Sequence, residues 1–243
     1  MSATGRLVGV GVGPGDPELM TLKAIRALGR ADVVAHFAKA GTAGNGRAIA
    51  EIHLRPGADE LPLLYPITTE IPKHDPTYRA TIAKFHDDAA AAVAARLEAG
   101  RTVAVICEGD PLFYGSFMHL HARLARRYPT EIIAGVTGMS GCWSAAGVPI
   151  AQGDDVLIVL PGTLTEAELT RRLAEADAAV VMKLGRNLPK VRRALIEARR
   201  LDRAVYVERG TMADSLVLRL AEKTDDRAPY FAVVLVPGFG AAR

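Results

Sequence analysis

Residues 7–17 read LVGVGVGPGDP, and residues 101–115 read RTVAVICEGDPLFYG. Each stretch joins a short apolar run, which favours a buried β-strand, to a turn rich in glycine and proline. A third turn of this kind, AGVTGMSG, spans residues 134–141 and follows a β-type run at 130–133. Strands that end in such turns and lead into helices are typical of an α/β fold with a mainly parallel sheet.

The rest of the chain alternates predicted strands and helices. Further strands are predicted at 32–36, 155–160, 178–183, 204–207, 216–220 and 231–236, and helices at 18–30, 77–99, 116–127, 166–174 and 188–200, with a small-residue helix ending near Gly147. Residues 41–46 are predicted to form a loop, and 56–76, with five prolines, a loop long enough for a substrate lid. The pattern restarts after Gly153. We therefore predict two domains, an N-terminal α/β domain with mainly parallel sheet over 1–150 and a C-terminal α/β domain with mixed sheet over 151–243.

Composition narrows the partners to expect. The net charge is +3 over 243 residues, and the lysines and arginines are scattered rather than gathered in a basic stripe, which argues against nucleic acid. The two cysteines, Cys107 and Cys142, argue against a disulfide framework or a thiolate zinc site. No apolar run reaches the ~18 residues of a membrane span, and the N-terminus lacks a secretory pattern. We expect a cytoplasmic protein without membrane contact.

The first turn matches nucleotide-binding loops only in part. A dinucleotide fingerprint, Gly-x-Gly-x-x-Gly, would need glycine at Pro14 or Asp16, and a phosphate loop would need Gly-Lys-Ser/Thr. The prolines of this turn also remove amide donors, which suits packing against a neutral adenosyl group better than cradling phosphates. A tight strand-to-helix turn without any ligand is the alternative.

The second turn, residues 108–115, brings carboxylates and aromatic rings to the end of a predicted buried strand. A carboxylate there can pair with a cationic group or with hydroxyls; the alternative makes Asp110 a helix cap and Tyr114 an ordinary core residue. The third turn offers hydroxyls and close backbone approach, with a loose connection as its alternative. Because the carboxyl ends of parallel strands share one edge of a sheet, three such turns together favour a ligand site.

Five segments together resemble the tetrapyrrole methylase family, a class of S-adenosylmethionine-dependent enzymes. The resemblance covers essentially the whole chain, with GVGVGPGDPELMTLKA at 9–24, EGDPLFYGSF at 108–117, GVTGMSG at 135–141, MKLGRN at 182–187 and VERGTM at 207–212. Within the family, EGDPLFYGSF and KLGRNLPKV most resemble the enzymes that methylate precorrin-2 at C-20 to give precorrin-3A in cobalamin biosynthesis. One alternative is a sister enzyme that acts at another ring position or on the cobalt-containing substrate. Another is a nucleotide-binding module without turnover.

The resemblance implies two α/β domains with the cofactor S-adenosyl-L-methionine in the cleft between them, and a homodimer. The family's cofactor contacts fall in this chain on Pro14, Glu108, Gly109, Asp110, Phe113, Thr137, Gly138, Leu184 and Gly210. Many relatives carry Gly-Gly-Asp where this chain has Glu108, Gly109 and Asp110. This departure places an extra carboxylate near the cofactor or the substrate.

Methyl transfer from a sulfonium to a ring carbon mainly requires alignment and exclusion of water, and the ring must also lose a proton. By position, the candidate catalytic residues are Glu108, Asp110 and Tyr114, with bound water or substrate carboxylates as alternative bases. The candidates for binding the carboxylates of the substrate are Arg47, Lys73, Arg79, Arg186 and Arg192. His119 and His121 would point to different sides of a helix, so no metal site is expected.

Overall fold

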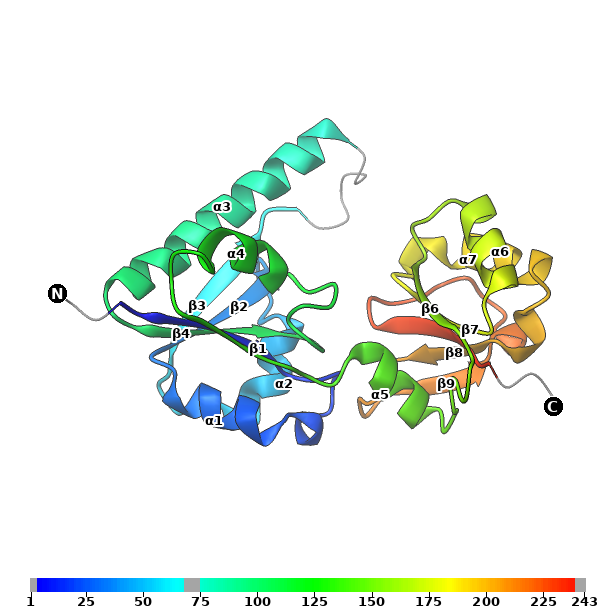
Figure 1. Ribbon diagram of the computed structural model, residues 1–243, viewed down its shortest axis with the longest axis horizontal. Coiled ribbons are helices and arrows are strands. Elements are labelled where there is room, and N and C mark those ends of the chain that lie inside the picture. The colour runs from blue at the N-terminus through cyan, green and yellow to red at the C-terminus, as the bar shows by residue number, and fades with distance from the viewer. Residues whose placement is uncertain (1–3, 68–74, 239–243) are drawn as a thin grey trace. The chain divides into compact units, whose positions relative to one another are not determined.

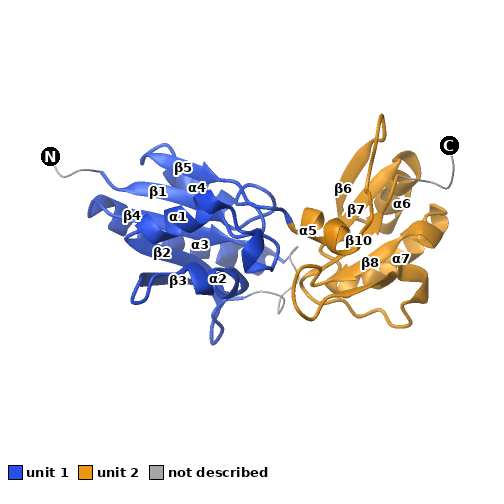
Figure 2. Cartoon of the chain, turned by 90° about the horizontal axis from the view of Figure 1, so that it is seen from below, with its two compact units in different colours: residues 1–137 blue, residues 138–243 orange. Residues whose placement is uncertain are grey.

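The structure is a computed structural model that describes residues 4–67 and 75–238. The chain divides into two compact units, Met1–Thr137 and Gly138–Arg243 (Figure 2). The sequence-based boundary at 150 falls later than this division. The reason is α5 (Gly138–Ala145), whose Cys142 packs among Val180, Val207 and Leu235 of the second unit.

The first unit is built on a five-stranded sheet in the order β3-β2-β4-β1-β5. Every pairing among its described strands is parallel, as the sequence predicted for most of this domain. Their bounds are β1 Arg6–Gly11, β2 Val33–Lys39, β3 Asp59–Tyr65, β4 Thr102–Cys107 and β5 Thr130–Ile133.

Helices cover both faces of this sheet (Figure 1). On one face α1 (Leu22–Arg30) and α2 (Asn45–Ala50) bury apolar side chains against Val10 and Ile106. On the opposite face α3 (Pro76–Glu98) and α4 (Phe117–Leu124) pack on Leu7 and Val105. The strands are therefore apolar on both sides, as expected for a parallel sheet between two layers of helix.

The second unit has a mixed five-stranded sheet in the order β6-β7-β10-β8-β9. Only β6 and β7 pair in parallel among its described strands, so the predicted mixed sheet is found. Helices α6 and α7 build one core, and α5 packs with a separate group of strand residues. The bounds are β6 Leu157–Pro161, α6 Glu166–Glu175, β7 Ala178–Met182, α7 Leu188–Glu197, β8 Val205–Glu208, β9 Leu216–Arg219 and β10 Ala232–Val236.

Two stretches near the N-terminus differ from the prediction. The helix expected over 18–30 begins only at Leu22, because the Thr21 hydroxyl accepts the Ala24 amide (3.1 Å) and caps it; Asp16 caps a separate 3₁₀ turn, Pro17–Leu19. The expected loop at 41–46 is cut short because α2 starts at Asn45.

The region predicted as a loop or lid over 56–76 contains a strand. Its residues Asp59–Tyr65 form β3, which pairs in parallel with β2 at the edge of the first sheet. The interpretation as a substrate lid otherwise falls largely on residues 68–74, which lie outside the described residues.

Candidate functional site

Two of the three glycine-bearing turns leave the sheet toward opposite faces. Gly11, at the end of β1, lies opposite Cys107, at the end of β4. From β1 the chain continues to α1 on one face of the sheet, and from β4 to α4 on the other face (Figure 1). Open α/β sheets bind ligands where neighbouring strands part in this way, so this edge is the candidate site.

Glycine is required where the three turns touch one another. A Cβ atom on Gly135 would overlap the carbonyl oxygen of Gly109, and one on Gly11 would lie 2.6 Å from that oxygen and 2.6 Å from the Gly135 amide. These contacts join backbone to backbone, so a side chain could enter only if the turns separated. The glycines Gly11 and Gly135 therefore hold the turns together.

Two backbone amides of the first turn, those of Val12 and Gly13, are already engaged. Gly109 N–H donates to the Gly13 carbonyl (2.7 Å), Gly13 N–H donates back to Gly109 (3.4 Å), and Val12 N–H donates to Cys107 (2.9 Å). Pro14, which is half-buried, has no amide hydrogen. Since a phosphate-binding loop needs free amides, this turn is poorly suited to hold a phosphate.

Asp110 links the second turn to the third. One carboxylate oxygen accepts the Leu112 amide (2.9 Å), and the other accepts the Gly135 amide (3.2 Å). Because both oxygens accept backbone hydrogen bonds, Asp110 is better suited to fix the turns than to remove a proton.

Two opposing effects act on the pKa of the Glu108 carboxyl. Burial raises its pKa, while hydrogen bonds from its own amide and from the Gly46 amide act in the opposite direction. A Cβ atom on Gly46 would lie 3.8 Å from the carboxyl carbon of Glu108, so the two residues are in direct contact. A partly buried carboxyl with a raised pKa is suited to accept or hold a proton.

Tyr65 and Ser116 are polar residues at this edge that the sequence reasoning missed. The Tyr65 hydroxyl lies 2.6 Å from the Ser116 hydroxyl, and burial raises the pKa of Tyr65, with a further contribution from the charge of Glu108. Tyr65 fell in a predicted loop, and Ser116 lies in the segment EGDPLFYGSF at 108–117 but was not singled out there. Only the pairing of β3 with β2 brings Tyr65 to the strand ends.

The aromatic pair of the second turn is accessible. The rings of Phe113 and Tyr114 meet edge to face, with centroids 4.9 Å apart. Tyr114 is 48% exposed, so the alternative that it is an ordinary core residue is wrong. Its φ of 54° is rare for a bulky residue, and such strain gathers at functional sites.

Thr137 and Gly138 stand where the two units join in sequence. Thr137 is partly buried at the end of the first unit. Gly138 opens α5, and a Cβ atom built on it would meet nothing within 4 Å. The backbone at Gly138 is thus open to approach, unlike that at Gly135.

Two of the predicted cofactor contacts in the second unit follow strained residues. Lys183 (φ 58°) precedes Leu184, and Arg209 (φ 48°) precedes Gly210. Leu184 is only 1% exposed and belongs to the core of the second unit. A Cβ atom on Gly210 would lie 3.0 Å from the sulfur of Cys142, where α5 packs closely.

A hydrogen-bond network holds the turn that carries Gly210. The buried Tyr206 hydroxyl donates to Glu208 (2.7 Å), and the Arg209 guanidinium donates to the other oxygen of Glu208 (2.6 Å). The Arg209 amide donates to the Phe231 carbonyl (2.7 Å). These bonds stabilise the left-handed conformation of Arg209.

Two of the predicted substrate-binding cations are used inside the protein. The Arg47 guanidinium makes two hydrogen bonds to Glu60 (2.9 and 3.0 Å) and one to Glu51 (3.0 Å). Arg192 binds Asp226 (3.0 Å) and backbone carbonyls of the segment 220–225. These bonds reduce the donors that Arg47 and Arg192 could offer to substrate carboxylates, and their role in binding substrate stays a prediction.

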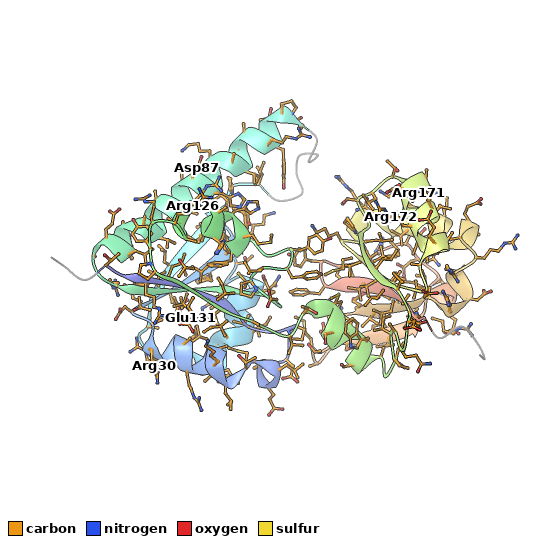
Figure 3. All side chains as sticks on the ribbon, viewed as in Figure 1. Arg30, Asp87, Arg126, Glu131, Arg171 and Arg172 are labelled. Atoms are coloured by element: carbon orange, nitrogen blue, oxygen red, sulfur yellow. The ribbon has the colours of Figure 1, made fainter. Side chains whose placement is uncertain are left out.

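The other cationic candidates for substrate binding are exposed or lie outside the described residues. Arg79, in the first turns of α3, and Arg186, before α7, are exposed. Lys73 lies outside the described residues. Elsewhere on the surface, Arg171 and Arg172 of α6 share Glu168, and Glu131 binds Lys23. Arg171, Arg172 and Glu131 are labelled in Figure 3.

Histidines and acidic groups form no metal cluster in the part of the chain that the structure describes. His119 stacks on the buried His86 of α3, with centroids 3.9 Å apart, whereas His121 lies near Phe117 (5.9 Å). The two histidines of α4 thus have different surroundings. Among the described helices, none is both long and apolar enough to cross a membrane.

Comparison with known proteins identifies the class that this fold and site define. Residues 6–224 match the family of tetrapyrrole (corrin/porphyrin) methylases, so the chain belongs to that family. The chain is 66% identical over 235 residues to the precorrin-2 C(20)-methyltransferase of Sinorhizobium sp, covering 97% of this chain and 96% of that protein. It is 51% identical to the cobalamin biosynthesis protein CobIJ of Mycobacterium bovis, of whose length the match covers 47%.

Solved structures share the two-unit α/β fold. A cobalt precorrin-4 methyltransferase superimposes with a TM-score of 0.71 at 24% identity, covering 96% of this chain and 94% of that one. The uroporphyrin-III C-methyltransferase of Thermus thermophilus, in complex with S-adenosylhomocysteine, does so with a TM-score of 0.66 at 24% identity, covering 96% and 92%. The predicted family and fold class are confirmed.

Proposed function

We propose that this chain transfers a methyl group from S-adenosyl-L-methionine to C-20 of precorrin-2, giving precorrin-3A in cobalamin biosynthesis. The observation that carries the proposal is the 66% identity to the Sinorhizobium precorrin-2 C(20)-methyltransferase, which extends over nearly the full length of both chains. The alternative of a nucleotide-binding module is disfavoured, since the Val12 and Gly13 amides already donate to the carbonyls of Cys107 and Gly109, and Pro14 has no amide hydrogen.

The residues of the site fit the proposed methyl donor. S-adenosylmethionine supplies a methyl group already activated by a sulfonium, which a nearby carboxylate and an uncharged turn can accommodate. We assign its binding to the family positions Pro14, Glu108, Gly109, Asp110, Phe113 and Thr137 of the first unit and Gly138, Leu184 and Gly210 of the second. Of these, Leu184 is buried in the core of the second unit.

The chemistry asks little of the protein beyond alignment and one proton transfer. A ring carbon forms a bond to the methyl carbon, the carbon–sulfur bond breaks with its electron pair going to sulfur, and the ring loses a proton. We assign Glu108 as the proton acceptor because burial raises the pKa of its carboxyl, whereas the Asp110 carboxylate ties the second turn to the third through the Gly135 amide. Asp110 fixes the turns, and the exposed ring of Tyr114 is placed to contact the substrate.

We propose metal-free precorrin-2 as the substrate rather than its cobalt complex. The chain is 66% identical to the Sinorhizobium enzyme but only 29% identical to the cobalt-precorrin-2 C(20)-methyltransferase of Salmonella typhimurium, over similar lengths. Arg79 and Arg186 are the cations proposed to meet the substrate carboxylates, because both are exposed.

A homodimer in the cytoplasm completes the proposal. The dimer rests on the family resemblance, and light scattering should give twice the chain mass of 25.8 kDa. Cytoplasmic location is supported by the two cysteines, which are both free and buried.

The test is to incubate the purified protein with precorrin-2 and S-adenosylmethionine labelled with ¹³C in the methyl group, and to locate the label by NMR. We expect label at C-20. Label at another ring carbon would show a sister enzyme, and a parallel reaction with cobalt-precorrin-2 that runs faster would reverse the choice of substrate. Tight retention of S-adenosylmethionine without transfer would favour a binding module.

A further inference from the structure

Helix α2 is the element that reaches Glu108 from outside the three turns. Gly46 lies against Glu108: a Cβ atom at Gly46 would come within 3.7 Å of the Glu108 amide nitrogen and 3.8 Å of its carboxyl carbon, and the Gly46 amide acts to lower the pKa of that carboxyl. The helix is only six residues long, Asn45–Ala50. So short a helix has little stability of its own, and its place must be set by tertiary contacts.

The contact that sets it is the ion pair between Arg47 and Glu60. Arg47 follows Gly46 directly, and its guanidinium binds both carboxylate oxygens of Glu60 on β3, at 2.9 and 3.0 Å. Two parallel hydrogen bonds from one planar group fix direction as well as distance. His36 on β2 supports the same carboxylate, with its Nε2 3.3 Å from Glu60, and is itself 5% exposed.

From this arrangement we propose that Arg47 and Glu60 are positioning residues for Glu108: their ion pair anchors α2 on the edge strand β3 so that the Gly46 amide meets the Glu108 carboxylate. The proposal rests on the proposed function for its catalytic consequence. Neither residue needs to touch substrate or cofactor.

The positive charge of Arg47 does not by itself explain how this residue would affect the titration of Glu108. Glu60 and Glu51 both bind the guanidinium and offset its charge locally. The titratable groups that interact electrostatically with Glu108 are Tyr65 on β3 and Cys107 on β4, both neutral at pH 7. Arg47 therefore influences Glu108 by fixing the position of the Gly46 amide.

The matched control is an ion pair at the neighbouring position of the same strand. Arg101 binds Asp59 (2.6 Å) at the start of β3, as Arg47 binds Glu60 one residue later in the chain but close to α2. The test compares the double variants Arg47→Met/Glu60→Met and Arg101→Met/Asp59→Asn. Each removes both members of an ion pair, so neither leaves an unpaired buried charge that would by itself unfold the protein.

The primary readout is the titration of the Glu108 carboxyl in substrate-free protein, followed by ¹³C NMR and assigned with Glu108→Gln. Loss of the Gly46 hydrogen bond removes an interaction that favours the charged form, so Arg47→Met/Glu60→Met should titrate at higher pH. The control pair should titrate like the native protein. An unchanged midpoint in the first variant, or an equal shift in both, overturns the proposal.

The second readout is methyl transfer as a function of pH. If Glu108 accepts the ring proton, the acid limb of kcat should move to higher pH in Arg47→Met/Glu60→Met, with a rate up to about tenfold lower on that limb, the factor for one pH unit. In a Glu108→Gln background the same pair of substitutions should have no further effect. If Glu108→Gln transfers methyl groups at the native rate, the assigned base is wrong, while the NMR titration still decides whether Arg47 and Glu60 position Glu108.

Discussion

The two units support their strand-end turns in opposite ways. In the first unit the turns after β1, β4 and β5 are joined by the absence of side chains, since Gly11, Gly109 and Gly135 allow direct backbone contact. In the second unit the turn at Gly210 is held by side chains, through the network of Tyr206, Glu208 and Arg209.

This difference teaches that the same kind of glycine-bearing motif can be built by two mechanisms. A backbone contact leaves no room for an added atom, so a single substitution there should cause a large loss of stability. A side-chain network can lose one bond and keep the rest, so a single substitution there should cause a smaller loss of stability. The following predictions test that distinction.

The largest effect is expected at the backbone contact. Gly135→Ala should destabilise the protein by about 3 kcal/mol, because the new methyl group must force the Gly109 carbonyl away. S-adenosylmethionine affinity should fall with it. Urea unfolding and calorimetric titration measure the two effects.

Its control is Gly29→Ala in α1, where a Cβ atom would meet nothing within 4 Å. That change should stabilise the helix by about 0.5 kcal/mol and leave affinity unchanged. If Gly135→Ala were as stable as the native protein, the turns would have to accommodate a methyl group at Gly135, which would contradict the prediction.

A smaller effect is expected in the side-chain network. Tyr206→Phe leaves one oxygen of the mostly buried Glu208 without its donor and should cost about 2 kcal/mol in urea unfolding. The matched control is Tyr128→Phe in the first unit, which removes a similar bond to the exposed Glu98 (2.8 Å) and should cost less than about 0.5 kcal/mol. Equal losses in the two variants would contradict the assigned role of burial.

The smallest effect concerns acid. All six histidines precede residue 122, so they lie in the first unit. Burial lowers the pKa of His86 to about 4, below its unfolded value, so the unfolded state binds the proton first as pH falls. The stability that neutral His86 contributes is complete above about pH 6.5 and is lost toward pH 4.

Between pH 7.5 and pH 5.5 this loss should amount to about 1 kcal/mol in the first unit. Hydrogen exchange of α3 and α4, corrected for intrinsic rates, measures it, and α6 and α7 serve as the internal reference. His86→Phe, which keeps a ring against His119, should reduce the dependence. Greater acid sensitivity in α6 and α7 would contradict the prediction.

Sequence reasoning predicted the elements and the motif-bearing turns well because both depend on local patterns. The apolar run 101–107 and the proline-stiffened turn at 13–17 are readable without the fold, and β4 and β1 end where these turns begin. The internal pairing of Arg47 and Arg192 could not be predicted, because their partners Glu60 and Asp226 lie elsewhere in the sequence. No local sequence pattern distinguishes an arginine that forms an internal ion pair from one that is available to bind a ligand.

By itself, the sequence determined the α/β class, the parallel and mixed sheets and the family, since periodicity, turn residues and motif wording are all local properties. Only the tertiary structure decided what the glycines of the turns do, which carboxylate links the second turn to the third and how α2 reaches Glu108. These features arise where segments distant in sequence touch, and contact geometry at that scale is set by packing rather than by residue type.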